Sequence, residues 1–172
     1  MKRGQQILIL TVIVQCTLLT RALSQTHWET AIYAEDTWHY FVGTTAPPAN
    51  WKNLDFDENN WSSGLGGFGY SDGDDNTTIP NTLAVFFRKS FQVDDLDEIL
   101  SAAVHSDYDD GFVAYLNGVE IARSFNMGTS GSVVPYDQTT DSDHEAVMYQ
   151  GGVPDVFILD YNDLDGLLQE GE

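Results

Sequence analysis

The amino-acid sequence predicts an all-β protein, an antiparallel sandwich, on the basis of three observations. Its apolar and β-branched runs are short and separated by Gly, Asn, Asp and Pro, and long stretches with a 3.6-residue period are absent after the first two dozen residues. Asn117 and Gly118 lie between two runs of alternating polarity and favour a tight type I′ hairpin, because both residues tolerate positive φ. Short strands at this spacing are typical of a sandwich rather than a parallel sheet.

Six segments are expected to form strands, namely residues 38–42, 83–93, 99–106, 112–116, 119–123 and 156–159. In the second segment, Val85, Phe87 and Phe91 fall on one face of the strand. Arg88 is among the residues on the opposite face, which we therefore expect to be the solvated side.

Two intervals, residues 46–79 and 126–147, are expected to be mostly loop, and residues 162–168 are expected to contain one short helical turn. The first interval includes a glycine-rich segment, residues 64–69, that matches the G-x-G-x-x-G pattern of phosphate-binding turns. No strand is expected before it, no helix after it, and carboxylates follow where a phosphate would lie. We therefore interpret the segment as a close-packed turn.

The first 24 residues are expected to be a cleavable secretory signal. Lys2 and Arg3 precede an apolar run over residues 7–19, and small residues just before position 25 favour cleavage after Ser24. The apolar run is shorter than the roughly 20 residues that a membrane-spanning helix needs, so no membrane insertion is expected after cleavage. The protein is therefore expected to be secreted or to lie at the cell surface.

Residues 25–172 are expected to form one acidic domain without a cysteine, because Cys16 lies in the signal. The whole chain has a net charge of −20, and removal of the three basic signal residues takes it to −23. Such a charge disfavours binding to nucleic acid or anionic membranes and attracts divalent cations. Aromatic residues make up 12% of the chain, so the acidity does not predict disorder.

Two acidic loops are candidates for structural calcium. Carboxylate and amide oxygens at alternate positions suit this ion, which takes six to eight hard oxygen ligands. The alternative is that each loop is a solvated turn whose Asp side chains accept hydrogen bonds from backbone N–H groups. The candidate ligands are Asp72, Asp74 and Asn76 in the first loop and Asp107, Asp109 and Asp110 in the second.

Tryptophan side chains are candidates for carbohydrate binding, because they offer flat apolar faces to sugar rings while nearby Asp and Asn bind the hydroxyl groups. Trp51 and Trp61 lie in predicted loops, so we expect them to be better exposed than Trp28 and Trp38. The alternative for each tryptophan is a place in the core or across its ends.

An ordered series of residues resembles a known family. The series contains Trp51-Lys52, Phe56-Asp57, Asn60-Trp61, Gly64, Gly69-Tyr70, residues 87–91, residues 107–123 and Asn126-Met127. It resembles a galactose-binding-like β-sandwich module of large secreted bacterial proteins, where the module occurs beside lamin-tail domains, CotH-type kinase domains or sorting domains. It is also similar to the sugar-binding domain of β-galactosidase-like glycosidases.

The resemblance covers nearly all of residues 25–172. It implies a jelly-roll sandwich, often with bound calcium, and no catalytic residues within the module. It also implies that the Arg88 and Asp107 positions mainly support the fold. Family members usually continue beyond a Leu-Leu-x-x-Gly-Glu stretch, which here ends the chain at Glu172. We therefore expect the sandwich to lack its last one or two strands and to be unstable or prone to aggregation alone.

These observations predict a non-catalytic extracellular accessory module of a larger secreted protein. Carbohydrate binding or adhesion is its expected function, with a glycan as ligand and further domains of the same parent chain as partners. Two alternatives stay open. In the first, the chain is an N-terminal fragment of a secreted glycosidase or other hydrolase whose catalytic domain is missing. In the second, it is a purely structural spacer.

Overall fold

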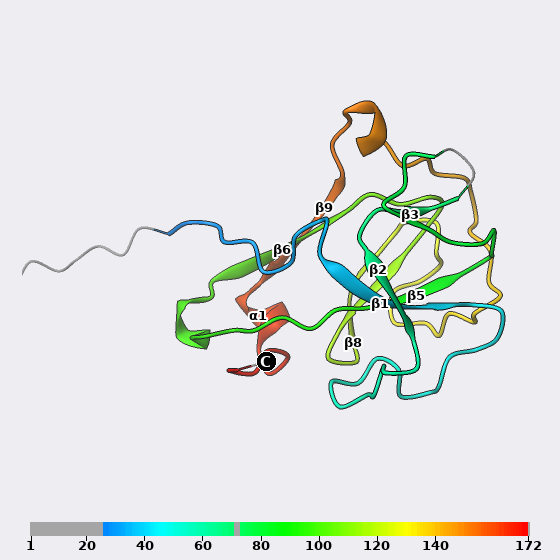
Figure 1. Ribbon diagram of the computed structural model, residues 1–172. Helices are drawn as coiled ribbons and strands as arrows, with labels where there is room; N and C mark the ends of the chain where they lie inside the picture. The colour runs from blue at the N-terminus through cyan, green and yellow to red at the C-terminus, as the bar shows by residue number, and fades with distance from the viewer. Residues whose placement is uncertain (1–25, 71–72, 172) are drawn as a thin grey trace, which may run out of the picture.

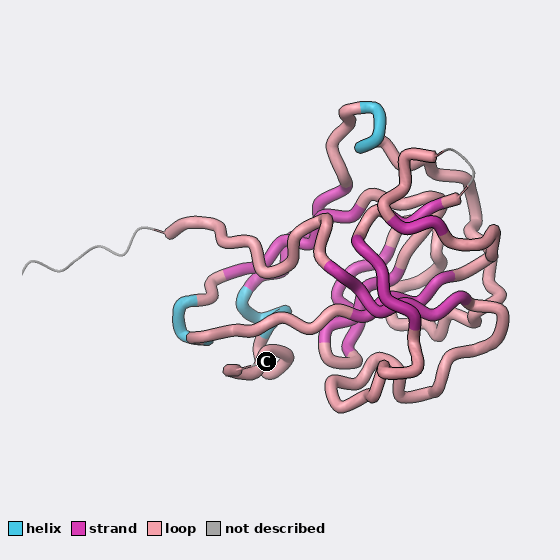
Figure 2. Tube along the Cα trace, in the orientation of Figure 1, coloured by secondary structure: helices cyan, strands magenta, loops and turns pink. Residues whose placement is uncertain are grey.

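The computed structural model describes residues 26–70 and 73–171, so the expected signal sequence lies outside the described residues. The described part consists of short strands joined by long loops, with almost no helix (Figure 1, Figure 2). No helix in it has the length and hydrophobicity that crossing a bilayer requires. The strands are β1 (Thr37–Val42), β2 (Ser62–Leu65), β3 (Phe68–Gly69), β4 (Thr77–Thr78), β5 (Val85–Arg88), β6 (Ser101–Ser106), β7 (Val113–Leu116), β8 (Val119–Arg123) and β9 (Asp155–Asp160). The helical segments are two 3₁₀ turns, Leu96–Glu98 and Met148–Gln150, and the helix α1 (Tyr161–Leu164).

The described strands pair in four small sheets. β1 lies between β2 and β5 and is antiparallel to both. β7 and β8 form an antiparallel hairpin, β6 and β9 form an antiparallel pair, and β3 and β4 pair in parallel over two residues. The predicted all-β class is confirmed, while the jelly-roll arrangement stays a prediction.

Most of the expected strands are present with shifted ends, but one of them is much shorter than expected. The segment 83–93 forms a strand only over Val85–Arg88, where it pairs with β1. The interval 46–79 is mostly loop, as expected, and also contains the short strands β2, β3 and β4, which were not expected. β2 has the sequence Ser-Ser-Gly-Leu, which has little intrinsic strand propensity, and it is a strand because β1 supplies its hydrogen-bonding partner.

The local turn predictions are confirmed. Asn117 and Gly118 have φ values of 48° and 90°, as a type I′ turn between β7 and β8 requires. The amide of Asn117 also donates a hydrogen bond to the main-chain oxygen of Leu167 at 2.7 Å, which links this turn to the C-terminal segment. The expected helical turn is α1, and a capping box from Asp160 satisfies the N–H groups of its first turn.

The pair of strands β1 and β5 is apolar on both faces. Phe41 and Phe86 lie opposite each other on one face, and Tyr40 and Phe87 on the other. Phe68 of β3 covers the second face, with its ring centroid 5.2 Å from that of Tyr40 and 4.7 Å from that of Phe87.

The expectation that Arg88 lies on a solvated face is wrong. Its side chain is only 12% exposed, because the loop that follows β1 covers this face and accepts hydrogen bonds from the guanidinium. Phe87, on the opposite face, is the more exposed of the two residues. The alternation of side-chain faces along β5 is as predicted, but the face that carries Arg88 is covered rather than solvated.

β6 and β9 form a two-stranded ribbon to the left of the β2–β1–β5 sheet in Figure 1, with α1 against both of its strands. Phe157 of β9 packs edge-on against Phe112, with 5.2 Å between ring centroids. The hydroxyl of Tyr108 donates a hydrogen bond of 2.7 Å to the carboxylate of Asp155. These contacts attach one face of the ribbon to the segment that leads into β7.

The glycine-rich segment is a close-packed turn, as interpreted from the sequence. A Cβ atom on Gly66 would lie 1.8 Å from the main-chain oxygen of Ala34, and one on Gly69 would lie 2.1 Å from the carboxylate of Asp75. The amide of Asn76 donates a hydrogen bond of 2.7 Å to the main-chain oxygen of Gly66. Glycine is therefore needed here for close backbone approach rather than for phosphate binding.

We expect Gly66→Ala to lower the free energy of unfolding by about 2 to 3 kcal/mol, because the new methyl group overlaps a backbone oxygen that cannot rotate away. The matched control is Gly73→Ala, where no atom lies within 4 Å and the cost is the positive φ of 85°, about 1 kcal/mol. Urea unfolding followed by tryptophan fluorescence measures both. Equal losses in the two variants would contradict the packing argument.

Candidate functional site

Trp51 and Trp61, the predicted carbohydrate-binding residues, lie side by side. Their ring centroids are 6.2 Å apart and their planes meet at 29°, so the indoles are stacked. The ring of Trp51 also packs edge-on against Phe86 of β5 at 5.1 Å and against Tyr115 of β7 at 5.9 Å. The tryptophan pair therefore joins the β1–β5 sheet to the β7–β8 hairpin, and Phe41 and Phe56 complete the cluster around Trp61.

Arg88 of β5 fixes the loop that carries both tryptophans. Its guanidinium donates hydrogen bonds to the main-chain oxygen of Trp51 and, at 2.9 Å, to that of Asn53. Its Nε also pairs with the carboxylate of Glu58 at 3.1 Å, and the guanidinium lies over the ring of Phe56 at 5.1 Å. Because a planar guanidinium makes strong and directional hydrogen bonds, these contacts together select one conformation of the loop.

Half-buried and exposed side chains alternate along residues 53–59 of this loop. The apolar side chains of Trp51, Leu54, Phe56 and Trp61 are half-buried. The exposed side chains form a rim of amides and carboxylates, which are the groups that donate hydrogen bonds to hydroxyls or accept them. The rim consists of Asn50, Asn53, Asp55, Asp57, Asn59 and Asn60.

The expectation that Trp51 and Trp61 are the better exposed tryptophans is wrong. Both lie in loops, as predicted, but both are half-buried, whereas Trp28 is 67% exposed. Loop position does not decide exposure here, because large aromatic side chains gain most by packing against neighbouring rings. Only part of each indole is therefore available to a ligand.

The first predicted calcium loop is described in part. Asp72 lies outside the described residues, and Asp74 is exposed. The amide of Asn76 donates to the main-chain oxygen of Gly66, so this side chain closes the glycine-rich turn.

The second predicted calcium loop holds a distant segment through its carboxylates. Asp107 accepts hydrogen bonds from the backbone N–H groups of Val147 at 2.8 Å and Met148 at 3.0 Å. Asp110 accepts one from the backbone N–H of His144 at 3.0 Å. This is the backbone-capping role considered above as the alternative to calcium.

Asp109 lies among other negatively charged side chains. Burial raises the pKa of its carboxyl, and the negative charges of Asp110 and Glu145 raise it further. In residues 26–70 and 73–171, however, no three His, Cys, Asp or Glu side chains are placed to hold a metal ion. Calcium binding at either loop therefore stays a prediction.

Tyr108 and His144 form a stacked pair beside β9. Their ring centroids are 4.2 Å apart and their planes meet at 14°. His144 Nδ1 lies 3.0 Å from the main-chain oxygen of Tyr108, and its Nε2 lies 3.9 Å from the carboxylate of Asp155. Burial, together with the hydrogen bond to Asp155, raises the pKa of Tyr108 to about 12, so the phenol remains a hydrogen-bond donor at neutral pH.

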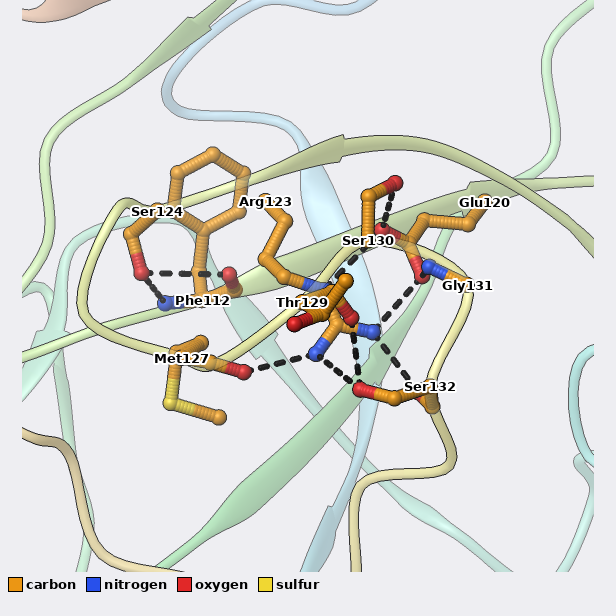
Figure 3. A network of polar contacts seen from close by, with 9 residues as sticks. All are labelled: Phe112, Glu120, Arg123, Ser124, Met127, Thr129, Ser130, Gly131 and Ser132. Atoms are coloured by element: carbon orange, nitrogen blue, oxygen red, sulfur yellow. Dashed lines mark hydrogen bonds and ion pairs between the residues drawn. The ribbon is translucent and has the colours of Figure 1, made fainter.

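Arg123 and Glu120 of β8 form an ion pair that is almost fully buried (Figure 3). Two hydrogen bonds, of 2.7 and 3.0 Å, join the guanidinium to the carboxylate. The guanidinium also donates to the main-chain oxygens of Met127 and Ser132, and the carboxylate accepts from the N–H of Gly131. The pair therefore holds the start of the 126–147 loop against β8.

The Glu120–Arg123 pair depends on a bulge that the sequence analysis missed. In a regular strand, residues three apart point to opposite faces. In β8, however, Ala122 pairs with Ala114 whereas Glu120 pairs with Tyr115, so Ile121 is an extra residue. The bulge brings both charged side chains to one face, and the alternation of polarity along the chain does not reveal it.

No family model matches the chain, and neither a curated protein nor a solved structure matches it. The resemblance to galactose-binding-like modules therefore rests on the residues and motifs of the sequence alone.

The hydrogen bond from Arg123 lowers the pKa of Glu120 from 4.5 to about 2, against the opposing effect of burial. The pKa in the folded protein is below the unfolded value, so the ionised pair adds its full contribution to the free energy of unfolding above pH 4.5. This contribution is lost as the pH falls from about 4.5 to about 2. We expect Glu120→Gln to lower the free energy of unfolding by about 3 kcal/mol at pH 7, because a buried guanidinium loses its charged partner.

Urea unfolding followed by circular dichroism between pH 2 and pH 7 measures this effect. The difference between the natural protein and Glu120→Gln should shrink toward pH 2, where the natural carboxyl is about half protonated. Asp137→Asn, at an exposed position, is the control for general loss of negative charge. A difference that stays constant over the whole pH range would contradict the role of the ion pair.

Proposed function

We propose that this chain is a non-catalytic extracellular accessory module of a larger secreted protein, and that it binds carbohydrate through the loop that carries Trp51 and Trp61. The observation that carries the proposal is the stacked tryptophan pair within a rim of exposed Asn and Asp side chains. A sugar ring packs its C–H face on an aromatic surface, while its hydroxyls need donors and acceptors close by. The loop supplies both.

The fixed conformation of the loop supports the same proposal. Arg88 of β5 donates a hydrogen bond to the main-chain oxygen of Asn53 in this loop. The ammonium of Lys52 lies 4.1 Å from the ring centroid of Tyr115. A loop that is ordered before the ligand arrives loses less conformational entropy on binding. This matters because each contact with a sugar hydroxyl group contributes little net free energy.

For the arrangement of the strands we propose a galactose-binding-like jelly roll. The antiparallel sheets and the tight β7–β8 hairpin support it. The candidate loop connects β1 to β2, and loops at strand ends commonly carry the ligand sites of such sandwiches. Secretion or cell-surface location, and further domains of the parent chain as partners, belong to the same proposal.

The glycan proposal predicts that Trp61→Phe weakens carbohydrate binding about tenfold, because the smaller ring retains the packing but offers less stacking surface. Asn60→Ala, on the exposed rim, should weaken binding severalfold with an unchanged melting temperature. Trp28→Phe is the matched control, because this tryptophan is exposed but lies outside the loop. A glycan array identifies the sugar, and titration calorimetry then measures each variant.

Equal glycan affinity of all three variants would contradict the proposal that this loop is the binding site. Absence of any bound glycan on the array would remove the function itself. The melting temperature of each variant separates a binding defect from a folding defect. Of the three substituted residues, Trp61 is the one that packs within the aromatic cluster, so a change in stability is expected for its variant alone.

We further propose that calcium, where bound, has a structural role in the loop that contains Asp74. Millimolar calcium, the range in which extracellular modules bind this ion, should raise the melting temperature, and a chelator should lower it again. Asp74→Asn should reduce the increase, whereas Asp137→Asn should not. A melting temperature that does not respond to calcium or to the chelator would end this proposal.

A further inference from the structure

β9 has an open edge beside an exposed apolar surface. Within residues 26–70 and 73–171 it pairs with β6 only, so no described strand occupies its other edge. Val156 and Ile158 point to one face of the ribbon and are 46% and 62% exposed, and Ala103 of β6 lies opposite Ile158 on that face. Phe157 points to the other face, where it contacts Phe112. The face that carries Val156 and Ile158 also carries His105 and Asp160, and only the opposite face of the ribbon is covered by the contact with Phe112.

The sequence of β9 lacks the usual protection of an edge strand. Natural edge strands carry Lys, Pro or a bulge, which prevents another strand from adding to them. β9 reads Asp-Val-Phe-Ile-Leu-Asp and pairs with β6 in unbroken register over six residues. A regular edge with alternate exposed apolar side chains is the kind of surface to which an extended peptide adds as a further strand.

The charges at the two ends of β9 restrict what can add to it. In an antiparallel pair of two copies, Asp155 of one copy would lie opposite Asp160 of the other, and in a parallel pair identical aspartates would face each other. Like charges opposite each other destabilise a strand pair. The net charge of −20 opposes self-association further. A second copy of this chain is therefore a poor partner, whereas a segment with basic residues at both ends is complementary.

We propose that the free edge of β9 binds an extended segment of another polypeptide, in which alternate apolar residues lie between Lys or Arg at both ends. The segment adds to the ribbon as a third strand. Its apolar side chains cover Val156 and Ile158, and its basic ends lie near Asp155 and Asp160. This surface is separate from the tryptophan loop and does not depend on carbohydrate binding.

The test uses a fluorescent synthetic peptide, Lys-Val-Thr-Ile-Thr-Lys, whose two Lys side chains point to opposite faces of the strand as those of Asp155 and Asp160 do, and a second peptide with Glu in place of both Lys. Anisotropy titrations of the purified protein should show binding of the basic peptide, at least tenfold weaker binding of the acidic one, and loss of affinity with added salt. Hydrogen exchange should slow at the amides of β9 when the basic peptide is bound.

Two variants make the test specific. Ile158→Lys places a charge on the exposed face and should abolish binding, whereas Val133→Lys makes the same change at a position that is 90% exposed in a distant loop and should leave binding unchanged. Asp160→Asn keeps an N-cap acceptor for α1 but removes the charge, so it should weaken binding severalfold and reduce the salt dependence.

Three results would overturn the proposal. The first is equal affinity for the basic and acidic peptides, the second is exchange protection elsewhere than in β9, and the third is a protein that dimerises through β9 at micromolar concentration. If Ile158→Lys fails to fold, the Asp160→Asn variant and the peptide pair still decide the matter. Loss of glycan binding in the tryptophan variants should leave peptide binding intact, so the two proposals can fail separately.

Discussion

The conformation of the loop between β1 and β2 depends on the guanidinium of Arg88. Residues 43–61 contain no strand or helix, so they have no regular backbone partners of their own. Arg88 reaches them from β5 and binds the main-chain oxygens of Trp51 and Asn53 and the carboxylate of Glu58. Because β5 pairs with β1, the same sheet that begins the loop also anchors it. The stacked tryptophans follow from this arrangement, since a loop fixed at these points turns its apolar side chains toward Phe86 and Tyr115.

Polar side chains hold the second long loop in a similar way. Asn126 is only 2% exposed, and its amide donates to the main-chain oxygens of Asp110 and Ser142. Arg123 binds the next turn of the same loop from β8. The single cysteine lies outside the described residues, so a disulfide within residues 26–171 is not available for this task. Directional hydrogen bonds from buried groups take its place, and they fix loop conformations where apolar packing alone would allow several.

Patterns that act over a few residues predict much of this fold. The alternation of side-chain faces along β5, the Asn117-Gly118 turn and the helical turn of α1 depend on neighbours in the chain, and the structure confirms them. The predictions that are wrong concern features that depend on residues far away in the sequence. β2 is a strand because of β1, the Arg88 face is covered because of the loop before β2, and Trp51 is half-buried because Tyr115 and Phe86 pack against it. The sequence could therefore point to the two tryptophans but not to the contacts that place them.

The acidic composition affects the two proposed surfaces in different ways. Around the tryptophan loop, Asp and Asn side chains are exposed next to aromatic rings, where they can bind hydroxyl groups without a change of charge. At β9 the aspartates lie at the two ends of an apolar edge, where they oppose pairing with an identical strand. Natural proteins more often protect an edge with Lys in the middle of the strand, which prevents pairing with any partner. Charges at the ends leave the centre of β9 apolar, so its edge is closed to copies of this chain but open to a strand of opposite charge.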